Sequence, residues 1–161
     1  MTNISIELVE LLKEKGLTLA TAESCTGGLV AKCITDVSGA SSVFYGGVVS
    51  YDNKVKMGVL GVKEETLRDY GAVSSYTAQE MAIGTRRACF TDIGISTTGI
   101  AGPTGGTPEK PVGTVYIGAC LGDKVFSKRL NIDPSFSRER IREEAVRELI
   151  SYIICKIKEN Y

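Results

Sequence analysis

The stretch GASSVFYGGVVSYDNKVK, residues 39–56, decides how the rest of the chain is interpreted. Its apolar, aromatic and β-branched middle, Val43–Tyr51, predicts a strand. Asp52 then ends the strand and can cap a short helix that carries Lys54 and Lys56. A strand that runs directly into a capped helix is typical of an α/β fold.

Polar side chains stand on both sides of this predicted strand. Ser41 and Ser42 precede it, whereas Tyr51 and the two lysines follow it. These groups can converge only if the serine loop folds back over the strand. They would then supply a hydroxyl nucleophile, a phenol and an amine, the parts of a serine–lysine hydrolase in which a desolvated lysine replaces histidine as the base. Loop serines and first-turn lysines are common, so the spacing alone leaves this a hypothesis.

The chain contains no histidine. This excludes the Ser-His-Asp triad, the Cys-His pair and every histidine-bearing metal site. Proton transfer near neutral pH must therefore use a shifted lysine, tyrosine, cysteine or carboxylate, or a water molecule. The five cysteines are scattered without metal or redox spacing. We therefore expect no metal and no other cofactor.

Charge and hydropathy limit which partners and which cellular compartment the sequence favours. Lysine plus arginine equals aspartate plus glutamate, at 19 each, which gives no electrostatic reason to expect a nucleic acid or an acidic membrane. No apolar stretch approaches the roughly 20 residues that span a bilayer, and the N-terminal stretch does not have the pattern of a signal peptide. Unpaired cysteines are typical of a reduced, cytoplasmic protein.

Helical and strand patterns alternate along the chain. Beyond the central stretch, helices are predicted at 4–15, 29–37, 63–70, 76–90 and from Ser137 onwards, and strands at 17–23, 93–98, 112–121 and 124–130. The last two strands flank Gly122-Asp123, a hairpin signal, so the sheet is mixed. The chain is long enough for one ordinary domain. We predict a single three-layer α/β/α domain over residues 1–161.

Two turns of small residues follow predicted strands. Residues 24–28, SCTGG, precede a helix whose first N–H groups lack partners, so this turn can cradle an anion. Residues 99–106, GIAGPTGG, let backbone approach a ligand closely. Such turns also occur without a ligand, but loops at strand ends are where α/β sites usually lie. Arginines 138, 140 and 142 crowd the start of the last helix, which indicates a nearby anion unless the flanking glutamates neutralise them.

Three stretches together resemble the C-terminal domain family of the competence/damage-inducible protein CinA. They are AESCTGG at 22–28, the stretch 39–56, and GIAGPTGG at 99–106 followed by KPVGT at 110–114. The resemblance covers nearly the whole chain in order. That family includes stand-alone nicotinamide-nucleotide amidohydrolases, and this chain is similar to the stand-alone form. Relatives often carry Gly-Asp before the first arginine of the last helix, where this chain has Phe136-Ser137.

The resemblance implies hydrolysis of nicotinamide mononucleotide to nicotinate mononucleotide and ammonia, a reaction of pyridine nucleotide salvage, by a metal-free serine–lysine mechanism. By motif, Ser41 matches the nucleophile, Lys56 the base and Tyr51 the assisting phenol. The substrate-binding positions implied by the same motifs are Ser24, Thr98, Gly99, Gly102 and Arg138. A lysine can act as the base only if burial or a nearby cation lowers its pKa from about 10.4 towards 7–8.

Two alternatives stay open. One is a nucleotide- or partner-binding module without catalysis, and the other is an amidase for a different small amide. The sequence does not separate Ser41 from its neighbour Ser42, whereas Lys54 is expected to face away from Lys56 because it lies two positions away on a helix. We expect a small-molecule partner, nicotinamide mononucleotide, rather than a nucleic acid or a membrane, and base rates favour a homodimer.

Overall fold

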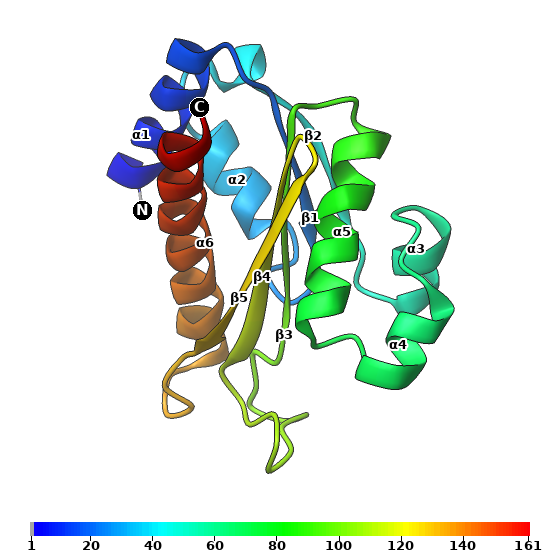
Figure 1. Cartoon of the computed structure of the whole chain (residues 1–161). Coiled ribbons are helices and arrows are strands. Elements are labelled where there is room, and N and C mark those ends of the chain that lie inside the picture. Colours follow the sequence, from blue (N-terminus) through cyan, green and yellow to red (C-terminus); the bar gives the residue numbers. More distant parts are fainter. Residues whose placement is uncertain (1) are drawn as a thin grey trace.

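A mixed sheet separates two layers of helices in the computed structural model, which describes residues 2–161 (Figure 1). The five strands lie in the order β2-β1-β3-β4-β5. The elements are α1 (Thr2–Lys15), β1 (Leu19–Glu23), α2 (Leu29–Thr35), the 3₁₀ turn η1 (Ala40–Ser42), β2 (Phe44–Val49), α3 (Asn53–Gly58), α4 (Glu64–Tyr70), α5 (Ser75–Ala88), β3 (Ile93–Gly99), β4 (Thr114–Leu121), β5 (Lys124–Asn131) and α6 (Arg138–Asn160). The predicted α/β/α class is confirmed.

The strand directions create one edge of the sheet at which three strands end together. β1 runs parallel to both β2 and β3, with Glu23 beside Val49 on one side and Thr97 on the other. β4 pairs antiparallel with β3 and with β5, so the predicted hairpin is confirmed. β1 is buried along its whole length, as expected for a parallel strand covered on both faces. We call the edge where β1, β2 and β3 end the carboxyl edge.

Helices α1, α2 and α6 cover one face of the sheet, and α5 covers the other, with α3 and α4 beside it (Figure 1). The helix α6 buries the stripe that its sequence predicts, because residues four apart lie on one side of a helix. That stripe is Ile141, Ala145, Leu149, Ile153 and Ile157, each with 0% of its surface exposed. The predicted cap is also present, since Ser137 Oγ accepts the N–H of Arg140 at 3.2 Å. Within residues 2–161, no helix is long and apolar enough to cross a bilayer.

Glycines let α5 lie close to the sheet. An ideal Cβ on Gly94 of β3 would lie 2.1 Å from the carbonyl oxygen of Ala82, and one on Gly118 of β4 would lie 2.4 Å from that of Ala78. Both distances are far shorter than a van der Waals contact, and the atoms met are backbone atoms that cannot move alone. The position of α5, and of the loop before it, therefore depends on these two glycines.

Gly94→Ala should lower the free energy of unfolding by about 1–3 kcal/mol or more, because the added methyl group forces α5 away from the sheet. Gly58→Ala is the matched control, since a Cβ there meets nothing within 4 Å. Its stability should stay the same or rise slightly, because alanine favours a helix more than glycine does. Urea unfolding of both variants measures the difference, and equal stability would contradict the close approach of α5.

Candidate active site

The Lys56 amine is buried at the carboxyl edge. Only 1% of this residue is exposed, and its Nζ donates to the carbonyl oxygen of Ser50 at 2.7 Å and to Ser24 Oγ at 3.1 Å. Ser24 directly follows β1, and Ser50 directly follows β2. The amine of α3 therefore joins the ends of two neighbouring strands and contacts a serine hydroxyl.

The local sequence explains this position. Asp52 caps α3, accepting the N–H of Lys54 at 2.7 Å, as the sequence predicts. The helix therefore starts at Asn53, with only three residues between it and the end of β2, and it lies against the carboxyl edge. Residues two apart on a helix point in different directions, so Lys54 lies exposed while Lys56 faces inwards.

Burial changes the acidity of Lys56. Loss of solvent around the amine lowers its pKa below the ordinary value of 10.5, because the charged form is disfavoured away from water. The negative charge of Asp52 acts in the opposite direction and raises that pKa. A lysine with a lowered pKa and a hydroxyl at 3.1 Å is an arrangement that can transfer a proton between amine and serine.

Ser41 does not meet Lys56. It lies exposed in η1, before β2 begins, whereas Lys56 lies beyond the other end of that strand. The six residues of β2 separate the two ends, and at about 3.3 Å per residue they hold Ser41 roughly 20 Å from the carboxyl edge. The serine loop does not fold back over the strand, so the expected Ser41–Lys56 pair is contradicted. Ser24, predicted as a substrate-binding residue, takes the place beside the amine.

An arginine of α6 forms hydrogen bonds with both Tyr51 and the loop that follows β3. Arg138 Nη2 donates to Tyr51 Oη at 2.8 Å, and Arg138 Nη1 donates to the carbonyl oxygen of Gly102 at 2.6 Å. The structure therefore brings together three residues that the family motifs put in the site. Both side chains are exposed, so their remaining polar atoms are accessible to a ligand.

The other predicted positions contribute mainly to the local fold. Thr98 is 1% exposed, and its hydroxyl donates to the carbonyl oxygen of Ala72 at 2.7 Å. An ideal Cβ on Gly99 would lie 2.7 Å from the carbonyl oxygen of Thr114, so packing requires glycine there. Gly102 has φ +73°, a backbone conformation that glycine adopts without strain, and it presents its carbonyl to Arg138.

The buried side chain of Glu23 holds the turn that carries Ser24. This carboxylate is 1% exposed and accepts the Thr26 hydroxyl at 2.6 Å. It also accepts three N–H groups at the start of α2, those of Gly28, Val30 and Ala31. A carboxylate with these four donors anchors a helix N-terminus and is not placed to act as a base. The thiol of Cys25 is buried, and burial raises its pKa to about 12, so it is not a nucleophile at neutral pH.

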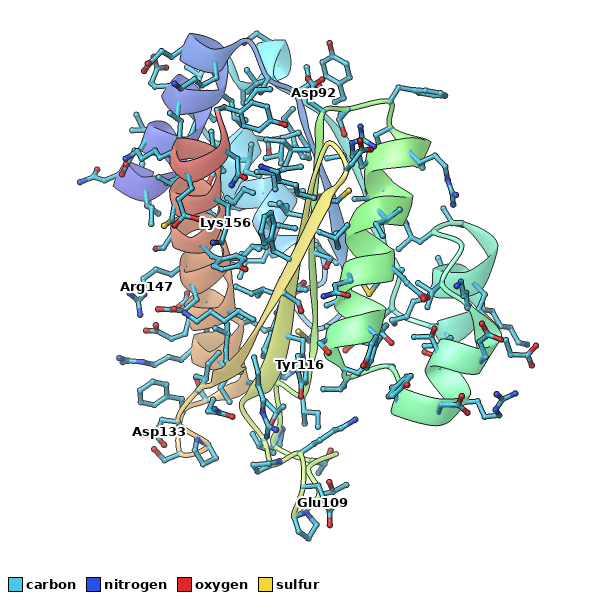
Figure 2. All side chains as sticks on the ribbon, in the orientation of Figure 1. Asp92, Glu109, Tyr116, Asp133, Arg147 and Lys156 are labelled. Carbon is cyan, nitrogen blue, oxygen red and sulfur yellow. The ribbon has the colours of Figure 1, made fainter. Side chains whose placement is uncertain are left out.

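The glycine-rich loop between β3 and β4 projects beyond the carboxyl edge. Figure 2 shows Glu109 at its outer end and Tyr116 further along, on β4. Residues 103–109 are all exposed. The loop is held at its flanks, where Lys110 Nζ donates to the carbonyl oxygen of Tyr70 at 2.9 Å and Arg129 Nη2 to that of Glu109 at 3.2 Å.

No three side chains of cysteine, aspartate or glutamate gather as a metal site anywhere in residues 2–161. The expectation that no metal takes part stays a prediction. The pairing of Ser24 with Lys56 was the main feature that sequence reasoning missed. The signal for it was present in the turn of residues 24–28, since parallel strands put the ends of β1 and β2 at the same edge.

Comparison with known proteins identifies the same family that the motifs resemble. The CinA C-terminal domain model matches residues 1–156. A CinA-like protein of Kosmotoga olearia is 51% identical over 146 residues, which cover 91% of this chain and 35% of the relative. A CinA-like protein of Leptospira borgpetersenii is 62% identical over 118 residues, covering 73% of this chain and 28% of the relative. The chain spans about a third of the length of these curated relatives.

Solved structures have the same fold. The competence damage-inducible protein A of Klebsiella pneumoniae superposes with a TM-score of 0.95 at 31% identity, covering 99% of this chain and 98% of that one. The competence/damage inducible protein CihA of Agrobacterium tumefaciens superposes with a TM-score of 0.92 at 37% identity, covering 96% and 93%. The chain therefore belongs to the CinA C-terminal domain family.

Proposed function

We propose that the chain is an amidohydrolase that converts nicotinamide mononucleotide to nicotinate mononucleotide and ammonia, with Ser24 as the nucleophile and Lys56 as the base. The observation that carries the proposal is the 3.1 Å contact between the buried Lys56 amine and Ser24 Oγ. The substrate comes from the family resemblance, because the geometry supports amide hydrolysis in general and does not select one amide.

The reaction follows from the Ser24–Lys56 contact. Neutral Lys56 takes the Ser24 proton as Oγ attacks the carboxamide carbon, and a tetrahedral oxyanion forms. The protonated amine then gives its proton to the leaving nitrogen, so ammonia departs and an ester on Ser24 remains. Water attacks this ester while Lys56 accepts a proton from the water. The tetrahedral species collapses as the Lys56 proton returns to Ser24 Oγ. The carboxylic acid leaves and gives its proton to solvent, which yields the carboxylate product.

Backbone donors beside Ser24 can stabilise the oxyanion. The N–H groups of Cys25 and Thr26 have no carbonyl or carboxylate partner within residues 2–161. They directly follow the nucleophile, at a turn before a helix start, where such donors stabilise developing negative charge. Losing one oxyanion donor typically costs about a hundredfold or more in turnover.

Arg138 and Tyr51 supply the polar surface for the rest of the substrate. Arg138 lies at the N-terminus of α6, where unpaired N–H groups also favour an anion. Its guanidinium is held by the Gly102 carbonyl and the Tyr51 hydroxyl. The proposal puts the phosphate of nicotinamide mononucleotide at this end and its carboxamide at Ser24.

Ser24→Ala should lower ammonia release from nicotinamide mononucleotide at least about a thousandfold, as loss of a serine nucleophile does in comparable enzymes. Ser41→Ala is the matched control and should keep turnover close to wild type, because Ser41 lies exposed at the other end of β2. Ammonia is measured for the mononucleotide and for a panel of amides with and without a phosphate.

The opposite ranking of the two serine variants would overturn the choice of Ser24. Release of ammonia only from another amide would replace the substrate and keep the mechanism. No release from any amide, together with binding of the mononucleotide, would favour a non-catalytic binding module.

The rate should rise with pH through the pKa of Lys56, because only the neutral amine can take the serine proton. Asp52→Asn should move this rise to lower pH, since the carboxylate it removes holds that pKa up. Asparagine keeps the cap of α3, so the helix should persist. The measurement is single-turnover ammonia release between pH 5 and about pH 10, a range that includes the ordinary lysine value.

Two controls accompany the pH profile. Lys56→Arg should be almost inactive at every pH, because a guanidinium stays protonated. Lys54→Arg should match wild type, since Lys54 is exposed and keeps its charge. An unchanged or upward-shifted profile in Asp52→Asn would remove Lys56 from the role of the base.

A further inference from the structure

A second arginine of α6 contacts the turn that carries Ser24. Arg142 Nη2 donates to the carbonyl oxygen of Thr26 at 2.6 Å. The side chain is half-buried, and an ideal Cβ on Gly27 would lie 3.4 Å from Nη2, an ordinary van der Waals contact, so the guanidinium lies directly against the turn. Arg142 lies four residues, about one helical turn, after Arg138. It contacts neither Ser24 nor Lys56 through any hydrogen bond of the described chain.

The contact continues through the backbone towards the nucleophile. The carbonyl of Thr26 and the N–H of Gly27 belong to one peptide group. That N–H donates to the carbonyl oxygen of Ser24 at 3.1 Å. The Ser24 carbonyl in turn shares its peptide group with the N–H of Cys25. Two hydrogen-bonded peptide groups therefore connect the Arg142 guanidinium to the first N–H after Ser24.

The dipoles of these two hydrogen-bonded peptide groups are aligned. Each peptide group accepts at its oxygen and donates at its nitrogen, so a positive charge at the first oxygen polarises both groups the same way. An arginine guanidinium carries a positive charge. Its charge therefore makes the N–H of Cys25 a stronger donor, and the pinned peptide groups hold that N–H in one orientation.

Contacts other than the one to Arg142 also hold the turn in its shape. On its inner side, the Thr26 hydroxyl contacts Glu23 Oε2 at 2.6 Å and Thr97 Oγ1 at 2.7 Å, and all three side chains are buried. The N–H of Ser24 is bound to the carbonyl of Thr97 at 3.0 Å. None of these contacts involves Arg142, so a neutral variant is expected to fold with its turn in place.

We propose that Arg142 is a positioning residue of the Ser24 site, which polarises and orients the N–H of Cys25 as a donor to the oxyanion. The inference rests on the proposed function, since it gives Ser24 the role of the nucleophile. Arg142 touches no reacting atom and acts through the two peptide groups of the turn. Its charge matters more than its bulk, so lysine can replace it in part while a neutral side chain cannot.

The test uses a small alkyl fluorophosphonate, which reports the same donor without requiring the natural substrate. Ser24 Oγ forms a bond to phosphorus, fluoride leaves, and the serine proton goes to Lys56. The phosphoryl oxygen gains negative charge in the transition state, so the labelling rate depends on the oxyanion donors. Intact mass and peptide mapping give the rate and the site of labelling for the purified chain and its variants.

Arg142→Gln should label Ser24 about tenfold more slowly than wild type, a smaller loss than removal of an oxyanion donor. Arg142→Lys should stay within about threefold of wild type, since ammonium keeps the charge as a point donor. Arg140→Gln is the matched control and should equal wild type, because Arg140 is exposed and lies over the ring of Phe136. Urea unfolding should give all three variants a midpoint close to that of wild type.

Equal labelling rates for Arg142→Gln and wild type would overturn the inference. Equal losses in Arg142→Gln and Arg142→Lys would overturn the role of the charge, as would a loss that follows a lowered unfolding midpoint. A wild-type chain that is not labelled at Ser24 would instead overturn the proposed nucleophile, and the inference with it. Labelling of wild type without hydrolysis of nicotinamide mononucleotide would reject the substrate alone.

Discussion

The buried amine of Lys56 is the constraint on which the carboxyl edge depends. Removing a charged ammonium group from water is costly unless its hydrogen bonds are replaced. Here the Ser50 carbonyl and Ser24 Oγ replace two of them, and the pKa of the amine falls. One buried amine therefore ties α3 to the ends of β1 and β2 through two hydrogen bonds, and its burial favours the neutral form that general-base chemistry needs. The fold and the proposed reaction share this interaction.

The remaining parts of the site are arranged around that contact by elements from distant parts of the chain. Glu23 holds the Ser24 turn on the start of α2, and Arg142 reaches the same turn from α6. One helical turn earlier, Arg138 joins Tyr51 to the loop at Gly102. The N-terminal part of α6 thus fixes both glycine-rich turns, which gives Arg138 and Arg142 a physical role despite their unfavourable position on the helix dipole.

Much of the fold could be predicted because it depends on local patterns. The α6 stripe, the caps at Asp52 and Ser137, and the β4–β5 hairpin are all readable from spacing, and the structure has each of them. Element ends differ by a few residues: β1 begins at Leu19, two residues after the predicted start. The sequence pattern of apolar residues does not show where the backbone hydrogen bonds of a strand begin and end. The boundaries of the elements were therefore the weaker part of the prediction.

The site was less predictable because it depends on strand direction rather than on sequence distance. Ser41 is nearer to Lys56 in sequence than Ser24 is, yet β2 carries Ser41 to the opposite edge while the parallel β1 brings Ser24 beside the amine. A crystal structure with a nicotinamide mononucleotide analogue whose carboxamide is an aldehyde tests the central claim most directly. The account predicts a covalent bond from Ser24 Oγ to the aldehyde carbon, with Lys56 Nζ beside that oxygen. A bond to Ser41, or binding away from Ser24 without a bond, would contradict it.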